Sequence, residues 1–170
     1  VLEWTGGLRV KEGEIQIIPN NNAATGIVHS PESSLWKAIM PDGTLVEPGT
    51  PGTLKYDYVT TPVTGGKIQV TNVLANQQQT EDPYAYQTFE TLTAKSDVNI
   101  PMIMKSLGLF PVDASCGGDN IYMRNIGERL PLRGGYYGAT AGAGVFYLYM
   151  YNLRATSGSY VGFRSAFVNL

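Results

Sequence analysis

The chain has 170 residues, 43% of them hydrophobic and only 15% charged, and this length suits one packed domain or a domain with a small accessory unit. Its net charge of -2 and pI of about 5.3 exclude the overall basic character that nucleic-acid binding normally requires. The single cysteine, Cys116, excludes an internal disulfide and a zinc site built on paired cysteines. No apolar run reaches the roughly 18 residues of a membrane helix.

Short β segments are expected over the first part of the chain, where Pro, Gly and Asn mark the turns. Alternating or β-branched runs predict four strands, over residues 14–18, 35–40, 54–60 and 67–73. A glycine pair near residue 66 indicates a boundary. We therefore expect a β-rich N-terminal segment or small domain over 1–66 and a ligand-binding domain over 67–170.

Two helices are expected in the middle of the chain. Tyr86, Phe89 and Leu92 recur at helical spacing behind an acidic start that contains Pro83, and a helix tolerates proline in its first turn. A second run of apolar residues at helical spacing, again behind an early proline, predicts a helix over 99–109.

Aromatic and β-branched runs return after residue 120 and predict strands over 121–123, 145–151 and 160–163. Together with the two helices, they indicate an α+β fold. Within the second run, alternation places Phe146, Leu148 and Met150 on one strand face. If that face is core, the tyrosines at 147, 149 and 151 line the exposed side, a large aromatic area to leave in water without a purpose.

Residues for catalysis are few. His29 is the only histidine and stands in no catalytic motif, so a structural or surface role is expected. Nucleophile-elbow, zinc-protease and phosphate-loop motifs are absent. A hydrolase that uses Asp113, Asp119 or Glu128 requires these carboxylates to converge in space, and nothing in their spacing indicates this or a calcium loop. We expect no enzyme activity, no metal site and no cofactor.

Charge is distributed unevenly, because no carboxylate follows Glu128. Four arginines do follow it, at positions 129, 133, 154 and 164. They are scattered among aromatic and glycine residues, so we expect them to hold loops through carbonyl hydrogen bonds, stacking and pairing with upstream acids. A phosphate-binding strip is the less favoured interpretation.

Tyrosine with small residues dominates positions 136–160, where Lys, Glu, Gln, Asp, His and Trp are all absent. This composition is typical of adaptable binding surfaces, because tyrosine offers a large contact area at low entropic cost and Gly and Ser permit varied loop shapes. By composition alone, a tyrosine-rich strand pair in an ordinary sheet is an equal alternative.

Four blocks of the sequence occur in a recognisable order, over 127–135, 143–146, Arg154 and 161–167. In this order and spacing the last fifty residues resemble the carboxy-terminal part of the variable proteins diversified by diversity-generating retroelements. That family belongs to the formylglycine-generating-enzyme-like branch of the C-type lectin fold. The resemblance implies a C-type-lectin-like domain with two helices and a β-rich variable region at its carboxy-terminal end.

The resemblance also implies which positions vary, because mutagenesis in that family acts on asparagine-type codons that can yield Tyr, Asn, Ser, Thr, Ala and Gly. By position, the implied ligand-binding residues are Tyr136, Gly138, Ala139, Gly142, Tyr149, Tyr151, Asn152, Thr156, Gly158, Ser159 and Tyr160. Met150 and Arg154 are implied to be scaffold. The active-site cysteines of the related enzymes are missing, so their catalysis is not expected here.

The function implied is that of a display protein on a virion or cell surface, with a hypervariable tyrosine-rich face that binds a macromolecule, expected to be a protein or receptor on another cell. Calcium-dependent sugar binding is not expected, because no carboxylate follows Glu128. The alternative is a structural virion module, from a tail or capsid, whose tyrosine-rich face is buried against a sister subunit. A homo-oligomer remains open in either case.

Overall fold

A computed structural model describes residues 1–21, 29–59, 67–82 and 84–163. These residues contain thirteen strands, one α-helix and three short 3-10 helices. The strands are β1 (Leu2–Trp4), β2 (Leu8–Lys11), β3 (Glu14–Ile17), β4 (Lys37–Ile39), β5 (Leu45–Val46), β6 (Lys55–Tyr58), β7 (Ile68–Thr71), β8 (Ala85–Thr88), β9 (Thr93–Ala94), β10 (Asn120–Met123), β11 (Glu128–Arg133), β12 (Leu148–Asn152) and β13 (Val161–Gly162). The helices are η1 (Pro19–Asn21), η2 (Phe89–Thr91), α1 (Met102–Ser106) and η3 (Tyr137–Gly142).

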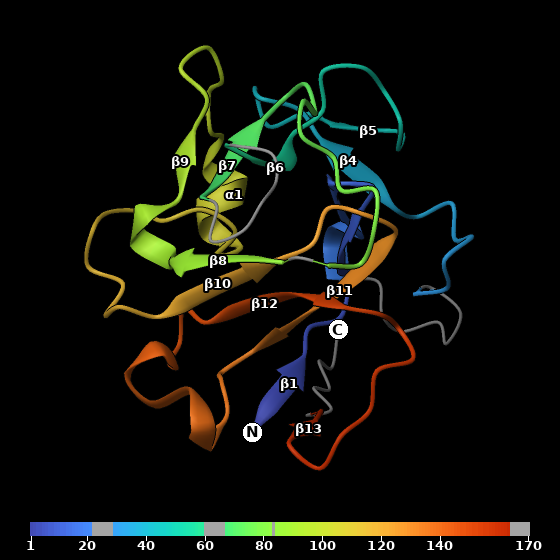
Figure 1. The fold of residues 1–170 in the computed structure, drawn as a ribbon. Helices are drawn as coiled ribbons and strands as arrows, with labels where there is room; N and C mark the ends of the chain where they lie inside the picture. The colour runs from blue at the N-terminus through green and yellow to red at the C-terminus, as the bar shows by residue number, and fades with distance from the viewer. Residues whose placement is uncertain (22–28, 60–66, 83, 164–170) are drawn as a thin grey trace.

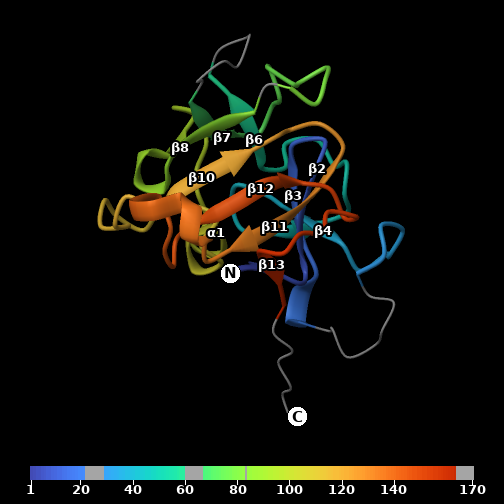
Figure 2. The same ribbon diagram turned by 60° about the horizontal axis from the view of Figure 1, so that its bottom comes forward.

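The strands form one hydrogen-bonded network in the order β8-β10-β12-β11-β2-β3-β6-β7-β9 (Figure 1). Four further strands lie beside this path: β1 pairs with β11 and also with β13, and β4 pairs with β3 and with β5. In Figure 2, β10, β12 and β11 run side by side across the middle of the molecule. Strands from both ends of the chain therefore build the same part of the sheet.

The β2–β3 hairpin shows how local sequence sets this network. Leu8 lies opposite Ile17 and Lys11 lies opposite Glu14, which leaves a two-residue turn at Glu12 and Gly13. Both turn residues have positive φ, 48° and 79°, as a type I′ hairpin turn requires. A Cβ at residue 13 would approach the Tyr56 carbonyl oxygen to 3.2 Å, so glycine fits both the backbone and the space.

The core lies against one face of strands β8, β10 and β12. Ile121 and Leu148 are register partners across the parallel β10–β12 pair, as are Met123 and Met150, and all four are fully buried. They join Ala85 and residues of the N-terminal strands in the largest hydrophobic cluster. Burying these apolar side chains provides the main favourable free energy of folding.

The expected α+β class, with two helices in a C-type-lectin-like domain, is wrong. The described residues form a mostly β structure, and the segment expected as the first helix contains strand β8 and the short η2 instead. Ala85 is buried and Tyr86 is exposed, so the segment alternates with a period of two and pairs with β10. The second helix, expected over 99–109, is limited to the five residues of α1.

The predicted strands are largely confirmed. Every strand run named from the sequence overlaps an observed strand, although most of the observed strands are shorter, as with β4 inside 35–40 and β13 inside 160–163. The end of the run over 54–60 and the block 164–167 lie outside the described residues. Across the expected boundary near residue 66, β6 pairs with β7. Within the described ranges, no helix has the length and apolarity that a membrane crossing demands.

Candidate ligand-binding face

Tyrosine side chains occupy the face of the sheet opposite the core. In β10, Tyr122 alternates with the buried Ile121 and Met123, and it is the register partner of Tyr86 in β8 and of Tyr149 in β12. Because register partners on one face lie close together, the three rings form a row across three strands. The period-two alternation that buries the core residues therefore places these tyrosines on the opposite side.

The row belongs to a cluster of six tyrosines in mutual ring contact, which we call the tyrosine cluster. Its members are Tyr84, Tyr86, Tyr122, Tyr147, Tyr149 and Tyr151. Tyr149 and Tyr151 are closest, with ring centroids 4.3 Å apart in an edge-to-face geometry. Tyr84 stacks on Tyr151 with centroids 5.3 Å apart and an angle of 11° between the ring planes. Such contacts fix the ring orientations relative to one another.

Depth differs strongly within the tyrosine cluster. Tyr147 is only 1% exposed and packs with Leu2 and Leu132 in a second, smaller hydrophobic cluster. Tyr86, at the other extreme, is 53% exposed, and Tyr149 is half-buried between them. The expectation that position 147 lies on an exposed face is therefore wrong, because β1 and β11 cover it. The cluster has a buried base and an open top.

Burial changes the acidity of these phenols. Desolvation raises the pKa of Tyr147 and of Tyr149, and for Tyr149 its neighbour Tyr151 adds to the shift through a hydrogen bond and through charge repulsion. The pKa of Tyr122 is also raised, with desolvation as the largest cause. The hydroxyls therefore stay neutral at physiological pH and can both donate and accept hydrogen bonds.

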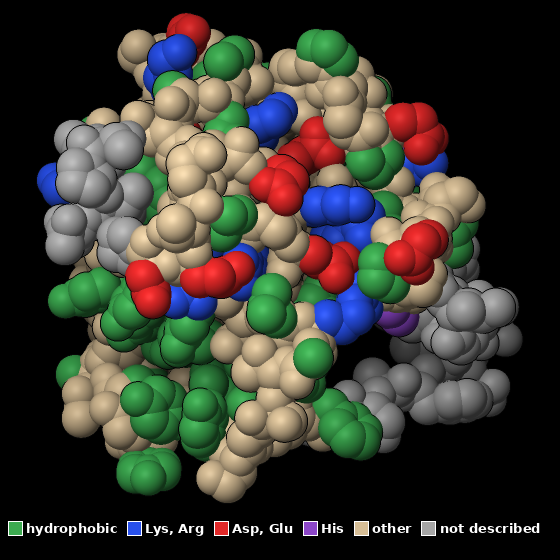
Figure 3. Space-filling view, turned by 45° about the vertical axis from the view of Figure 1, so that its right-hand side comes forward, with side chains coloured by type: hydrophobic (Ala, Val, Ile, Leu, Met, Phe, Trp, Pro, Cys, Tyr) green, Lys and Arg blue, Asp and Glu red, His purple; other side chains and the backbone are tan. Residues whose placement is uncertain are grey.

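A charged rim borders the tyrosine cluster on one side. The guanidinium of Arg124 lies 4.8 Å from the centre of the Tyr151 ring, and it pairs with Asp82 at 2.7 Å and Glu81 at 3.4 Å. Arg129 binds Glu81 at 2.7 Å and donates to the Tyr151 carbonyl oxygen at 3.2 Å. Figure 3 shows hydrophobic side chains gathered at the lower left, below a band of adjacent acidic and basic side chains.

Three more tyrosines, which we call the outer trio, lie beyond the cluster. Tyr136 contacts Tyr137 and Tyr160, with centroid distances of 5.9 and 5.4 Å. Tyr136 also packs with Tyr122 and Tyr149 against the smaller hydrophobic cluster, which joins the two groups of rings. The tyrosine cluster and the outer trio together form what we call the tyrosine face.

Of the eleven positions implied to bind ligand, five belong to this surface or pack directly against it. They are Tyr136, Ala139, Tyr149, Tyr151 and Tyr160. Gly138 and Gly158 lie beside the rings of Tyr136 and Tyr160, where added Cβ atoms would come within 2.6 and 3.4 Å of ring carbons. The expected positions therefore converge in space, although they come from η3, β12 and the turn before β13.

The remaining four positions are placed differently. Asn152 shares the core-facing side of β12 with Leu148 and Met150 and is 8% exposed, so its side chain does not reach the tyrosine face. A Cβ at Gly142 would meet the side chain of Asn120, which borders the cluster through the Tyr122 hydroxyl. Thr156 and Ser159 lie in the turn between β12 and β13.

The expected structural role of the late arginines is confirmed for the three that the structure describes. Arg129 donates to two carbonyl oxygens and pairs with Glu81, while Arg133 donates to the carbonyl oxygens of Leu107 and Gly108. Arg154 forms two hydrogen bonds to Glu128 and one to the His29 carbonyl oxygen. Arg164 lies outside the described residues.

The polar groups weighed for catalysis serve structural contacts. His29 accepts a hydrogen bond on Nδ1 from the Gly7 backbone, as expected for a structural histidine. Glu128 binds two arginines, Asp119 accepts the backbone N–H of Phe146 at 2.8 Å, and Asp113 accepts the backbone N–H two residues ahead of it. In the part of the chain that the structure describes, no three metal-binding side chains gather at one point.

Three members of the tyrosine cluster were not expected from the sequence: Tyr84, Tyr86 and Tyr122. Two of them lie in the segment assigned to a helix, where spacing alone gave no reason to place them beside residue 149. The useful signal was the alternation of Tyr122 with Ile121 and Met123, which matches the alternation in β12.

Comparison with known proteins provides no relative from which a role could be transferred to these residues. No protein-family model matches the chain, and no curated protein matches it significantly.

Proposed function

We propose that the protein is a binding module that presents the tyrosine face to a macromolecular ligand, a protein exposed on another cell. The observation that carries this proposal is the contiguous set of tyrosine rings with a buried base and an exposed top. Soluble proteins rarely leave a contiguous aromatic surface of this kind in water unless it binds something. A virion or cell surface is the location that fits this role.

The chemistry of the face suits protein recognition. Tyrosine supplies a large apolar ring with a polar end and few rotatable bonds, so little entropy is lost when it binds. The neutral hydroxyls of Tyr122 and Tyr149 provide hydrogen bonds without the cost of burying a charge. The Arg124–Asp82 pair at the border adds a polar rim around an aromatic centre, which is the usual anatomy of a protein interface.

We further propose that the face is diversified, as the resemblance to retroelement-encoded variable proteins implies. The positions implied to vary lie mainly in η3 and in the turn before β13, which flank the rings rather than the core. A side chain at Gly138 or Gly142 requires the flexible side chains of Tyr136 or Asn120 to move, because an added Cβ would come within 2.6 or 2.3 Å of them. Met150 is fully buried and Arg154 pairs with Glu128, which suits the scaffold role implied for both.

Deep sequencing of this locus in its source population tests the proposal. We expect substitutions to concentrate at the surface positions implied to vary, such as Tyr136, Tyr151 and Tyr160. Buried neighbours of the same strands, Leu132, Leu148 and Met150, serve as matched controls and should stay constant. An even distribution of substitutions over both groups would refute diversification of this face.

The alternative, a structural module with the tyrosine face in a subunit interface, predicts a different result in solution. If sister subunits bury the face, light scattering should give a defined multimer, and Tyr86→Asp should dissociate it because a charge would be buried at the contact. A display module with a free face gives the same mass for the unmodified chain and the variant. Dissociation by Tyr86→Asp, with Val112→Asp as an exposed control elsewhere, would favour the structural module.

A further inference from the structure

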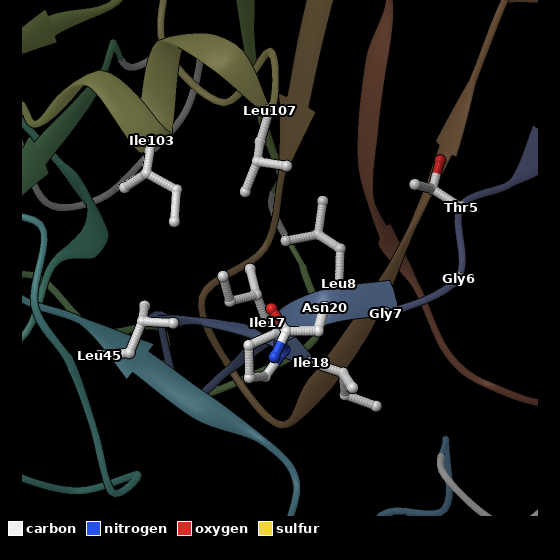
Figure 4. Close-up of a pocket in the computed structure, with 11 residues that line it drawn as sticks. Thr5, Gly6, Gly7, Leu8, Ile17, Ile18, Asn20, Leu45, Ile103 and Leu107 are labelled. Carbon is white, nitrogen blue, oxygen red and sulfur yellow. The ribbon is translucent and has the colours of Figure 1, made fainter. Parts of the chain in front are cut away.

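A cavity of about 410 Å³ lies between the β2–β3 hairpin and helix α1 (Figure 4). None of its lining residues belongs to the tyrosine face, so it is a separate site. Ile103 in α1 and Leu107 directly after it point into the cavity, Leu45 enters from the side, and Leu8 and Ile17 form the opposite wall. The side chains of three separate parts of the chain thus face one common space.

The wall of this cavity is held in place by the sheet. Leu8 and Ile17 are register partners in the β2–β3 hairpin, and both are buried members of the main core. Ile103 and Leu45 are partly buried and pack against the same core. Because the residues that shape the cavity are fixed by strand pairing and core packing, the space is formed before any ligand arrives.

The two ends of the cavity differ in polarity. The end formed by Leu45, Ile103 and Leu107 is wholly apolar, whereas Thr5 lies at the far end with two glycines (Figure 4). Asn20, held at a positive φ of 62°, adds a second polar side chain to the lining. No charged side chain lines the cavity.

We infer that this cavity binds a small neutral molecule with an aliphatic or aromatic body and one polar group at the Thr5 end. A cavity of roughly 150 Å³ is enough to hold benzene, so 410 Å³ accommodates a body two to three times larger, such as a medium-chain alcohol. An ionised head group would find no partner charge in the lining, which disfavours acids and amines. The size also excludes a helix or a folded partner.

The test titrates the full chain with a series of straight-chain primary alcohols, from hexanol to dodecanol, by ligand-observed NMR. We expect saturable binding of one molecule per chain, with affinity that rises with chain length and then falls once the cavity is full. Decanoate at neutral pH should bind at least about tenfold more weakly than decanol, because its carboxylate finds no partner charge in the lining. Absence of saturable binding for every alcohol would overturn the inference.

Three substitutions, in α1 and at Leu107 directly after it, locate the binding site. Leu107→Trp fills the cavity and should weaken decanol binding by at least about tenfold, whereas Met102→Trp, on the same helix but 71% exposed and outside the lining, should leave it unchanged. Ile103→Ala enlarges the cavity and should shift the preferred alcohol to a longer chain. Equal effects of the two tryptophan variants, or an unchanged length preference in Ile103→Ala, would show that the alcohols bind elsewhere.

Discussion

Two tyrosines, Tyr147 and Tyr137, play opposite roles because they lie at different depths. Tyr147 precedes β12 and is enclosed by Leu2 and Leu132, so it supports the cluster from below. Tyr137, ten residues earlier, is 95% exposed and touches Tyr136 alone among the described rings. Residue type alone therefore does not tell which tyrosines are exposed and which support the fold.

Truncating these two tyrosines should separate the two roles. We expect Tyr147→Ala to lower the free energy of unfolding by about 3–5 kcal/mol, because it empties a fully buried ring site. Tyr137→Ala should change it by less than about 0.5 kcal/mol. Denaturant unfolding followed by circular dichroism measures both, and equal losses in the two variants would contradict the depth assigned to Tyr147.

Among the strands, the contact between β2 and β11 joins the N-terminal hairpin to the part of the sheet that carries the tyrosine face. Its polar centre is Glu128 in β11, which binds Arg9 of β2 at 2.8 Å and Arg154 at 2.9 Å. Desolvation raises the pKa of Glu128, but its hydrogen bonds to Arg154 and Arg9 outweigh this, so the net pKa is lowered. The carboxylate is therefore stabilised in the folded chain.

Glu128→Gln should destabilise the chain by about 2–3 kcal/mol at neutral pH, because the side chain of Arg9 is buried and would lose its partner charge. The native pKa of Glu128 lies below 4.5, so its stabilising contribution is complete above pH 4.5 and is lost as the pH falls through the native value. Melting curves of both chains should therefore converge as the pH is lowered. A constant difference down to acid pH would mean that the charge of Glu128 is not what stabilises this contact.

At the scale of the whole molecule, buried tyrosine side chains make the stability of both the main core and the tyrosine cluster sensitive to alkaline pH. Five tyrosines have a pKa raised above 10.0, chiefly by desolvation: Tyr56, Tyr58, Tyr122, Tyr147 and Tyr149. The first two belong to the main core and the others to the tyrosine cluster. Both regions therefore retain neutral hydroxyls when an exposed tyrosine has already ionised.

Because the folded pKa values lie above the unfolded value of 10.0, these groups stabilise the fold fully below pH 10, and this contribution is lost as the pH rises through the folded values. We expect the melting temperature to fall steadily above pH 10. Tyrosinate absorbance should show that these five of the eleven tyrosines ionise only together with unfolding. A single titration of all tyrosines near pH 10, without unfolding, would contradict their burial.

Strands could be predicted from the sequence better than the contacts between distant segments, because alternation is local and those contacts are not. Alternation is a local signal, so the runs 67–73 and 145–151 overlap the observed β7 and β12. Tyr86 and Phe89 also satisfy helical spacing, so local sequence leaves both structures open. The segment at Tyr86 forms a strand because β8 pairs with β10, which lies more than thirty residues further along the chain. Burial of Tyr147 was equally hidden, since its cover comes from Leu2 at the other end of the chain.

Strand β1 also determines when the tyrosine face can form during synthesis. Glu3 pairs with Arg133 and with Gly162, so the first strand has to wait for roughly 130 residues before its partners exist. At ribosomal speed this delay is on the order of ten seconds, during which β1 remains without these partners. The part of the sheet around Leu2 and Tyr147 is therefore completed only after β11 and β13 have been synthesised, although β1 itself is made much earlier.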